Sequence, residues 1–167
     1  MEIKTIEPFL EYWKSVRGRT RRVAQAIPDD RMDWSHAPGR FTFGGILRHL
    51  ATIERYMYAE TVQGKPSIYP GYDKGLQQGG ETPLEFMDRL DAESIEIFRK
   101  LSDEDLTGKC VTPAGSSITI SKWLRAMVEH EAHHRGQLYM MLSMLGVAAP
   151  PLYGLTEEEV RARSAPR

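Results

Sequence analysis

The sequence predicts an all-α protein, a four-helix bundle with long connections, on three observations. Four long segments repeat apolar residues at steps of three and four, the pattern of amphipathic helices. Sustained alternation of apolar and polar residues, which would indicate half-buried strands, is scarce, and no repeat recurs at a fixed spacing. With 167 residues and 41% hydrophobic content, the chain is long enough for one core and short for two, so we expect a single domain over residues 1–167.

The first expected helix covers residues 5–27. Its apolar positions keep the helical spacing, and Pro28 prevents its continuation. Residues 28–42 are rich in Pro, Asp, Gly and Arg, which predicts a surface connection, although Trp34 indicates that part of it returns to the core. A second amphipathic helix is expected over residues 43–63.

The third helix follows a segment unsuited to regular structure. Residues 64–80 contain five glycines and two prolines, which predicts a loop that can cover a cleft. Thr82 is then placed to cap a helix, Pro83 suits the first helical position, and Glu85 completes a capping box. We expect this helix to reach about Leu101.

The fourth helix is expected over residues 120–145, after a short helical turn at 102–106 and a linker. Gly146 suits its left-handed cap, and Pro150 and Pro151 prevent its continuation. A last short helix is expected around residues 156–163. The loops of about 15 to 17 residues that join the first three helices exceed the usual bundle connection, which favours a functional site or a crossover there.

Composition excludes several classes of protein. The formal net charge is −1, from 22 basic and 23 acidic residues, and neither sign forms a block that would follow a phosphate backbone, so we expect no nucleic-acid partner. No apolar run approaches the roughly 18 residues of a membrane span. The single cysteine, Cys110, excludes an internal disulfide framework, and the first residues lack a secretory pattern, so we expect a cytoplasmic protein. Cys110 lies in a linker and is not expected to be a nucleophile.

The candidate functional residues are histidines on the apolar stripe of the fourth helix. That stripe consists of Ile120, Trp123, Met127, His130, His134, Gln137, Met141 and Met144. His130 and His134 are one turn and about 40 degrees apart, so both can bind one cation. A neutral imidazole in an apolar seam needs partners for its ring nitrogens, and a metal ion satisfies two together. The methionines of this helix, Met140 included, are expected to fill gaps in the core.

A third metal ligand is expected from the second helix. His49 is in phase with the buried face of that helix, whereas His36 lies in a Pro- and Gly-rich segment. His133 faces a neighbouring direction and could substitute for His134 or support the ligands. Three neutral nitrogens suit Zn, Ni or Fe(II), and such an ion would acidify a bound water or thiol. Gln137 and Tyr56 are weaker candidates for residues that line its open position.

A competing interpretation comes from the five residues that begin at His130. They fit the pattern H-E-x-x-H, in which Glu131 would be the general base of a zinc peptidase. The longer metzincin pattern fails, because Gly136 comes one residue too early and no later histidine follows. No convincing strand is available to bind an extended peptide. We therefore expect Glu131 to be solvated or to support the metal ligands.

The chain resembles the DinB family, also described as DinB/YfiT-like metalloenzymes. The resemblance covers nearly the whole sequence and rests on Asp33 and Trp34, on residues 45–50 (GILRHL) and, most specifically, on residues 130–138 (HEAHHRGQL). It implies that the metal ligands are His49, His130 and His134. It also implies a four-helix bundle with an unusual crossover connection, often assembled as a homodimer.

The function implied by the resemblance is a metal-dependent thiol S-transferase. Better understood relatives use bacillithiol, mycothiol or glutathione with a small-molecule substrate, and a metal with an open position can hold a thiol as the reactive thiolate. Two alternatives stay open. One is a metal-dependent hydrolase that uses metal-bound hydroxide, assisted by Glu131, and the other is a non-catalytic metal-binding module of the stress response.

Overall fold

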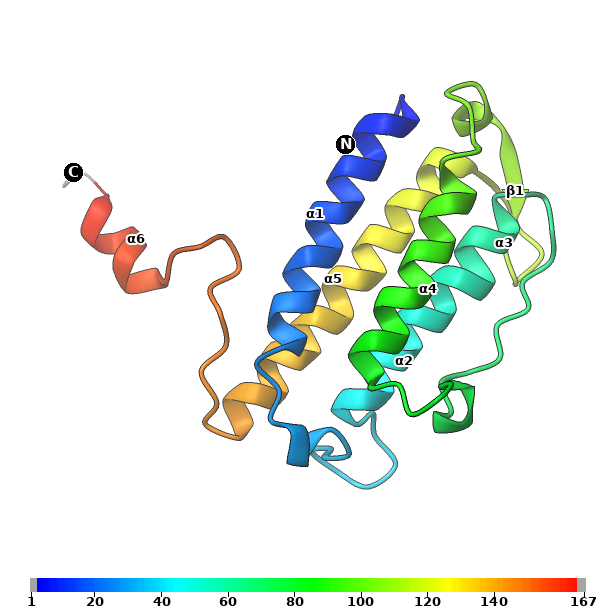
Figure 1. Ribbon diagram of the computed structural model, residues 1–167. Coiled ribbons are helices and arrows are strands. Elements are labelled where there is room, and N and C mark those ends of the chain that lie inside the picture. The colour runs from blue at the N-terminus through cyan, green and yellow to red at the C-terminus, as the bar shows by residue number, and fades with distance from the viewer. Residues whose placement is uncertain (1–2, 165–167) are drawn as a thin grey trace.

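The four long helical patterns all form helices in the computed structural model, which describes residues 3–164. These are α1 (Ile6–Ala24), α2 (Phe43–Ile53), α4 (Pro83–Phe98) and α5 (Ile120–Met144), which lie side by side as a bundle (Figure 1). Each presents an apolar face to a common interior, as the spacing of apolar residues predicts. The predicted fold class, an all-α four-helix bundle, is therefore confirmed.

The order of the helices around the bundle explains two long connections. The main packing contacts join α1 to α5, α5 to α2, α2 to α4 and α4 to α1. Helices α1 and α2 are therefore diagonal to each other, and so are α4 and α5. Residues 25–42 and 99–119 must each cross an end of the bundle, which short turns could not do. Residues 64–80 instead join neighbouring helices, so crossing does not explain their length.

The second helix continues beyond α2 through an irregular turn. A π-helical turn (Glu54–Tyr58) follows α2 directly, and α3 (Ala59–Thr61) completes the segment, so helical structure extends over residues 43–61. The sequence predicted one helix over residues 43–63 without the π turn. Such turns often occur at functional sites.

The helix ends follow the expected capping signals. Thr82 and Glu85 form the predicted capping box at the start of α4. Gly146 has φ 67 and follows the end of α5, a backbone conformation that favours glycine. The last helix, α6 (Glu157–Arg163), starts with a capping box that we did not predict, between Thr156 and Glu159. Its residues are all exposed, and it stands apart from the bundle (Figure 1).

Short elements complete the chain. The expected turn at residues 102–106 forms as a 3-10 turn at Asp105–Thr107, and further 3-10 turns occur at Asp29–Arg31 and Lys74–Leu76. Strands β1 (Lys109–Val111) and β2 (Ser117–Thr119) form an antiparallel hairpin that the sequence analysis missed. Three-residue strands are too short to show alternation.

The apolar core consists of two clusters with a polar layer between them. One cluster includes Val23, Leu90 and Leu138, and the other includes Trp13, Phe98 and Met127. Trp34 packs against the first cluster, as expected. The prediction was wrong for Met140 and Met144, which are 64% and 59% exposed. Met140 lies off the apolar stripe of α5, and Met144 is the last residue of that helix, beyond the buried Met141.

No helix among residues 3–164 is both long enough and apolar enough to cross a membrane.

Candidate metal centre

Helices α2 and α5 bring three imidazoles together inside the bundle. The Nε2 atoms of His49 and His130 are 3.2 Å apart, and those of His134 and His130 are 3.1 Å apart. One nitrogen from each of the three rings lies within 4.8 Å of the others. The ligands of a tetrahedral zinc ion, at about 2.0 to 2.1 Å from the metal, stand roughly 3.3 Å from one another. The donor set therefore fits a divalent ion that requires facial imidazole ligands.

The outer nitrogens of two rings are held by neighbouring side chains. His49 Nδ1 lies 2.7 Å from the hydroxyl of Tyr69, and His134 Nδ1 lies 2.7 Å from Oε1 of Gln137. An amide oxygen only accepts, so the proton of His134 is on Nδ1, and its Nε2 lone pair faces the centre. The Tyr69 hydroxyl can accept or donate, so a proton on His49 Nδ1 that is donated to Tyr69 is the tautomer that leaves the Nε2 lone pair for the centre. Both contacts hold the orientation of a ring, and the Gln137 contact also sets the tautomer that a metal requires of His134.

Burial keeps the three imidazoles neutral. It lowers the pKa of His49 to about 4, with a further contribution from neighbouring His134. It lowers the pKa of His130 to about 3, assisted by the other imidazoles and by Arg17. The pKa of His134 is also lowered, again mainly by burial, and the hydrogen bond to Gln137 partly opposes this effect. Neutral rings at pH 7 keep their lone pairs available for a cation.

Aromatic rings from the two long loops surround His49. The ring centroids of Phe41, Tyr69 and Tyr72 lie 5.2, 5.8 and 6.0 Å from that of His49. Phe41 also contacts the His134 ring, at 5.7 Å. The composition of residues 64–80 predicts a loop that can cover a cleft, but none of these residues could be identified from the sequence, because loop positions have no periodicity.

Among the weaker candidates, Gln137 lies at the centre and Tyr56 does not. Gln137 holds His134 and also donates from Nε2 to Nε2 of the exposed His133, at 3.3 Å. The Tyr56 ring instead lies 5.2 Å from the guanidinium carbon of Arg55. Within residues 43–61 it is Tyr58, in the π-helical turn after α2, that contacts the histidine cluster. Its ring centroid lies 6.4 Å from that of His130.

Glu131 faces away from the histidines. The residue is 1% exposed, so of the two expectations, a solvated residue or one that supports the metal ligands, the first was wrong. Nη1 of Arg17, on α1, donates to both of its carboxylate oxygens, at 3.2 and 3.1 Å. A carboxylate held in this way is not placed to act as a general base at the centre.

Arg17 is the hub of a buried ion cluster that the sequence analysis missed. Besides Glu131 on α5, it contacts Glu54 in the π turn and, through Nε at 3.4 Å, Asp91 on α4. Asp91 also accepts from the indole of Trp13, at 3.1 Å. One cation thus joins carboxylates of three other helical segments. Charged residues on an amphipathic helix are usually solvated, so the sequence offered no signal for this cluster.

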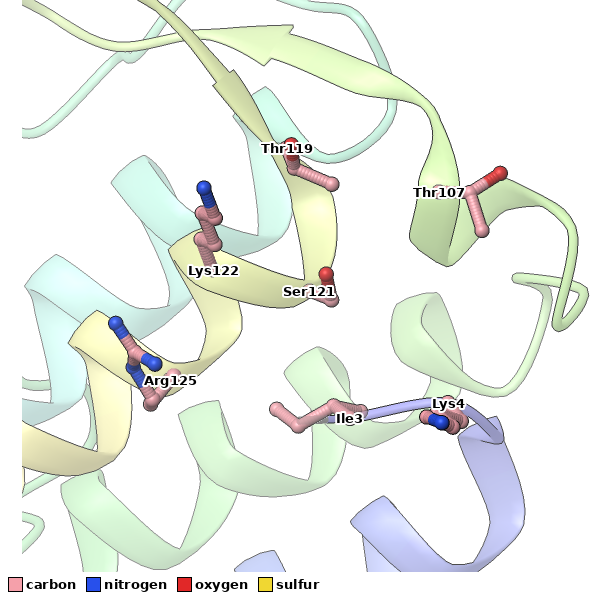
Figure 2. Close-up of a pocket in the computed structure, with 7 residues that line it drawn as sticks. All are labelled: Ile3, Lys4, Thr107, Thr119, Ser121, Lys122 and Arg125. Carbon is pink, nitrogen blue, oxygen red and sulfur yellow. The ribbon is translucent and has the colours of Figure 1, made fainter. Parts of the chain in front are cut away.

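Neither His36 nor the cavity at the start of α5 adds a ligand to the histidine cluster. His36 is exposed in the connection that precedes α2. A cavity of about 740 Å³ lies at the opposite end of α5 and is lined by Lys4, Lys122 and Arg125, among others (Figure 2). Figure 2 shows these side chains around the start of α5, and none of the residues that line the cavity is a histidine.

Comparisons with known proteins identify the family and the fold. The model of the DinB superfamily matches residues 12–138, the family that the sequence resembles. YjoA of Bacillus subtilis is 24% identical over 148 residues, which cover 86% of this chain and 93% of YjoA. Its crystal structure has a TM-score of 0.71 at 20% identity and covers 90% of this chain and 100% of that one.

Two further solved structures share the fold. YfiT from Bacillus subtilis, described as "a probable metal-dependent hydrolase with an unusual four-helix bundle topology", has a TM-score of 0.63 at 18% identity and covers 86% of this chain and 89% of its own. The mycothiol-dependent maleylpyruvate isomerase has a TM-score of 0.61 at 12% identity and covers 86% of this chain and 62% of its own. At such identities the likeness establishes the fold alone.

Proposed function

The chain belongs to the DinB superfamily, whose model spans residues 12–138, and from that premise we propose that it is a divalent-metal-dependent thiol S-transferase. In this proposal His49, His130 and His134 bind the metal, and the second substrate is a small electrophile. The cosubstrate is a low-molecular-weight thiol of the bacillithiol, mycothiol or glutathione type.

The observation that carries the proposal is the convergence of three neutral Nε2 atoms. Separations of 3.1 and 3.2 Å between ring nitrogens match ligand spacing around one small cation. Three protein ligands also leave a coordination position free, as in catalytic rather than closed structural sites. Zinc, nickel and iron(II) all accept imidazole ligands, so each is a candidate for the native metal.

A divalent ion in this site would supply Lewis acidity, which lowers the pKa of a thiol or a water that it binds. The protein supplies orientation and shielding. Tyr69 and Gln137 hold the Nδ1 protons of His49 and His134, and this keeps both Nε2 lone pairs directed at the centre. Phe41 and Tyr72 pack against His49 and limit the access of water.

Transfer to a thiol is preferred over the hydrolase alternative for a structural reason. A hydrolase of this design would use a nearby carboxylate to accept a proton from water, and Glu131, the candidate for that role, is paired with Arg17 instead. The description of YfiT as a probable metal-dependent hydrolase keeps hydrolysis as the second candidate. The mycothiol-dependent isomerase, which shares the fold, supports a thiol cosubstrate. We propose further that the protein works as a cytoplasmic homodimer.

The test combines His134→Ala with a panel of thiols. The wild-type protein, loaded in turn with Zn, Ni or Fe(II), should consume one of bacillithiol, mycothiol and glutathione in the presence of a chlorinated or epoxide acceptor. His134→Ala should lose turnover while it keeps most of its thermal stability. Lys122, exposed on the same helix and outside the histidine cluster, provides the control, and Lys122→Ala should keep both.

Two results would contradict the proposal. Metal-dependent hydrolysis without consumption of any thiol would favour the hydrolase. A large fall in the melting temperature of His134→Ala, with no activity in the wild type, would indicate a metal that serves structure alone.

A further inference from the structure

A cavity beside the histidine cluster is lined mainly by apolar side chains. We call it the methionine pocket, and its volume is about 640 Å³, within the range of small-molecule sites. Its apolar lining comes from Phe41, Ile46, Met140, Met141 and Met144. Exposed methionines are costly in water, and their flexible, polarizable side chains adapt to the shape of an apolar ligand. The exposure of Met140 and Met144, which the sequence did not predict, is therefore informative.

The lining of the methionine pocket carries positive charge, from Arg40, and no negative charge. The polar residues that line it are Gln137, His36 and Arg40, and no carboxylate is among its lining residues. Arg40 forms no ion pair or side-chain hydrogen bond with any residue in the range 3–164. A guanidinium without a partner at the edge of an apolar pocket is suited to a carboxylate, which it can bind through two parallel hydrogen bonds. The neighbouring polar cavity, by contrast, combines Arg40 with Asp33 and Asp73.

Two lining residues also belong to the histidine centre. Gln137 accepts a hydrogen bond from Nδ1 of His134, and the Phe41 ring packs on both His134 and His49. A molecule in the methionine pocket therefore lies against Gln137, which orients His134, and against Phe41, which packs on His134 and His49.

We propose that the methionine pocket binds the electrophilic substrate and that this substrate has an apolar body and a carboxylate, the carboxylate being held by Arg40. The proposal rests on the proposed function for the identification of the bound molecule as a substrate. The binding itself needs only the pocket, so it can be measured without metal or turnover.

The experiment measures binding of octanoate to the full-length protein by calorimetry, with octanol and acetate as comparison ligands. Octanoate should bind more tightly than either, because only octanoate offers both an apolar chain and an anion. Arg40→Gln should weaken octanoate binding roughly tenfold or more, through loss of a charged hydrogen-bonding partner. Met144→Glu should weaken it to a similar degree, through repulsion and lost apolar contact.

Control variants separate this pocket from the others. Lys122→Gln alters the cationic cavity of Figure 2 and should leave octanoate binding unchanged. Lys74→Gln alters only the polar cavity that shares Arg40 and should likewise have no effect. The proposal is overturned if octanol binds as tightly as octanoate, if Met144→Glu binds octanoate normally, or if Met144→Glu converts a dimer to a monomer while octanoate binding persists.

Zinc titration of the same samples distinguishes this proposal from the proposed function. Arg40→Gln should bind zinc as the wild type does, since Arg40 contacts none of the three histidines among the described residues. A wild-type protein that binds octanoate but no zinc would overturn the metal-dependent function and leave the pocket in place. Zinc binding without octanoate binding would do the reverse.

Discussion

Each of His49 and His134 is positioned at both ring nitrogens. Nε2 faces the cluster, and Nδ1 meets a neighbouring oxygen at 2.7 Å. An imidazole that can rotate loses conformational freedom when it binds a metal, whereas one already held by a hydrogen bond loses little. The residues that hold the rings should therefore affect metal affinity without touching the metal.

Tyr69→Phe tests this point. The substitution keeps the aromatic ring beside His49 but removes the hydroxyl that forms a hydrogen bond with Nδ1. We expect zinc affinity, measured by competition with a chelator, to fall roughly tenfold or more, as is usual when such a partner is removed.

Tyr72→Phe is the matched control. Its ring also contacts His49, at 6.0 Å, but no hydrogen bond joins its hydroxyl to the described part of the chain. This variant should bind zinc as the wild type does. Equal affinity of the two variants would show that ring packing, and not the hydrogen bond, orients His49.

The three histidines could be predicted from sequence, whereas the residues around them could not. His49, His130 and His134 lie on helices, where spacing shows which positions share the buried face. Tyr69 and Tyr72 lie in a loop, so their approach to His49 depends on a chain path that no period encodes. Their one sequence signal was the length of that loop, which joins neighbouring helices and so exceeds what the connection needs.

At the scale of helices, the buried ion cluster fixes how the segments that bear the ligands sit relative to each other. Arg17 on α1 binds Glu54, which lies just after α2, and Glu131, which is adjacent to His130 on α5. These contacts lie in the polar layer between the two apolar clusters. A buried charge pair tolerates few geometries, because any loss of contact leaves a desolvated charge.

Arg17→Met should therefore destabilise the protein strongly. The variant leaves the buried carboxylates of Glu54 and Glu131 without their cation, which costs about 3 to 5 kcal/mol in comparable cases. Urea unfolding of the metal-free protein measures this loss. Neutralising the carboxylates as well, in Arg17→Met with Glu54→Gln and Glu131→Gln, should recover much of the stability.

Arg21→Met is the control on the same helix. Arg21 pairs with Asp88 in an ion pair whose side chains are 46% and 37% exposed. Removal of a surface pair should change stability by about 1 kcal/mol or less. If Arg17→Met were equally mild, the cluster would not be the constraint that the geometry indicates.

Elements with local signals were predictable, and those that depend on packing were not. The capping box at Thr82 and the glycine cap at Gly146 act within a few residues, so the sequence reveals them. The π turn at residues 54–58 carries no composition signal. It places Glu54 against Arg17 on the diagonal helix α1, a contact that exists only once the bundle has formed.

The topology of the whole molecule makes the site depend on global folding. His49 and His130 are 81 positions apart in the chain, and their helices meet because the connections of residues 25–42 and 99–119 cross the bundle ends. The sequence predicted long connections before and after the second helix, of which only the first crosses, and it did not predict the crossing at residues 99–119. No local segment can assemble the centre, so the protonation of its imidazoles is linked to the stability of the entire fold.

The metal-free protein should therefore lose stability between about pH 6.5 and pH 5. In the fold the pKa values of His49 and His130 are lowered from 6.5 to about 4 and about 3, and that of His134 is also lowered. Over this window the unfolded chain takes up protons that the folded chain does not, so acid favours unfolding. The destabilisation is absent above the ordinary histidine pKa and grows as pH falls toward the folded values. Urea unfolding of the metal-free protein across this range measures the slope.

His130→Gln isolates the contribution of the histidines from that of the carboxyl groups. Burial raises the pKa of Glu131 above 4.5, which opposes the trend because the folded state then binds the extra proton. The lowered pKa values of Glu81 and Glu85 act in the same direction as the histidines, but only below about 4.5. All three carboxyl groups remain in His130→Gln, which lacks one of the three titrating imidazoles, so its stability should fall less steeply between about pH 6.5 and pH 5. An unchanged slope would mean that His130 is protonated equally in the folded and unfolded chains, and its ring would then not be a neutral ligand waiting for a metal.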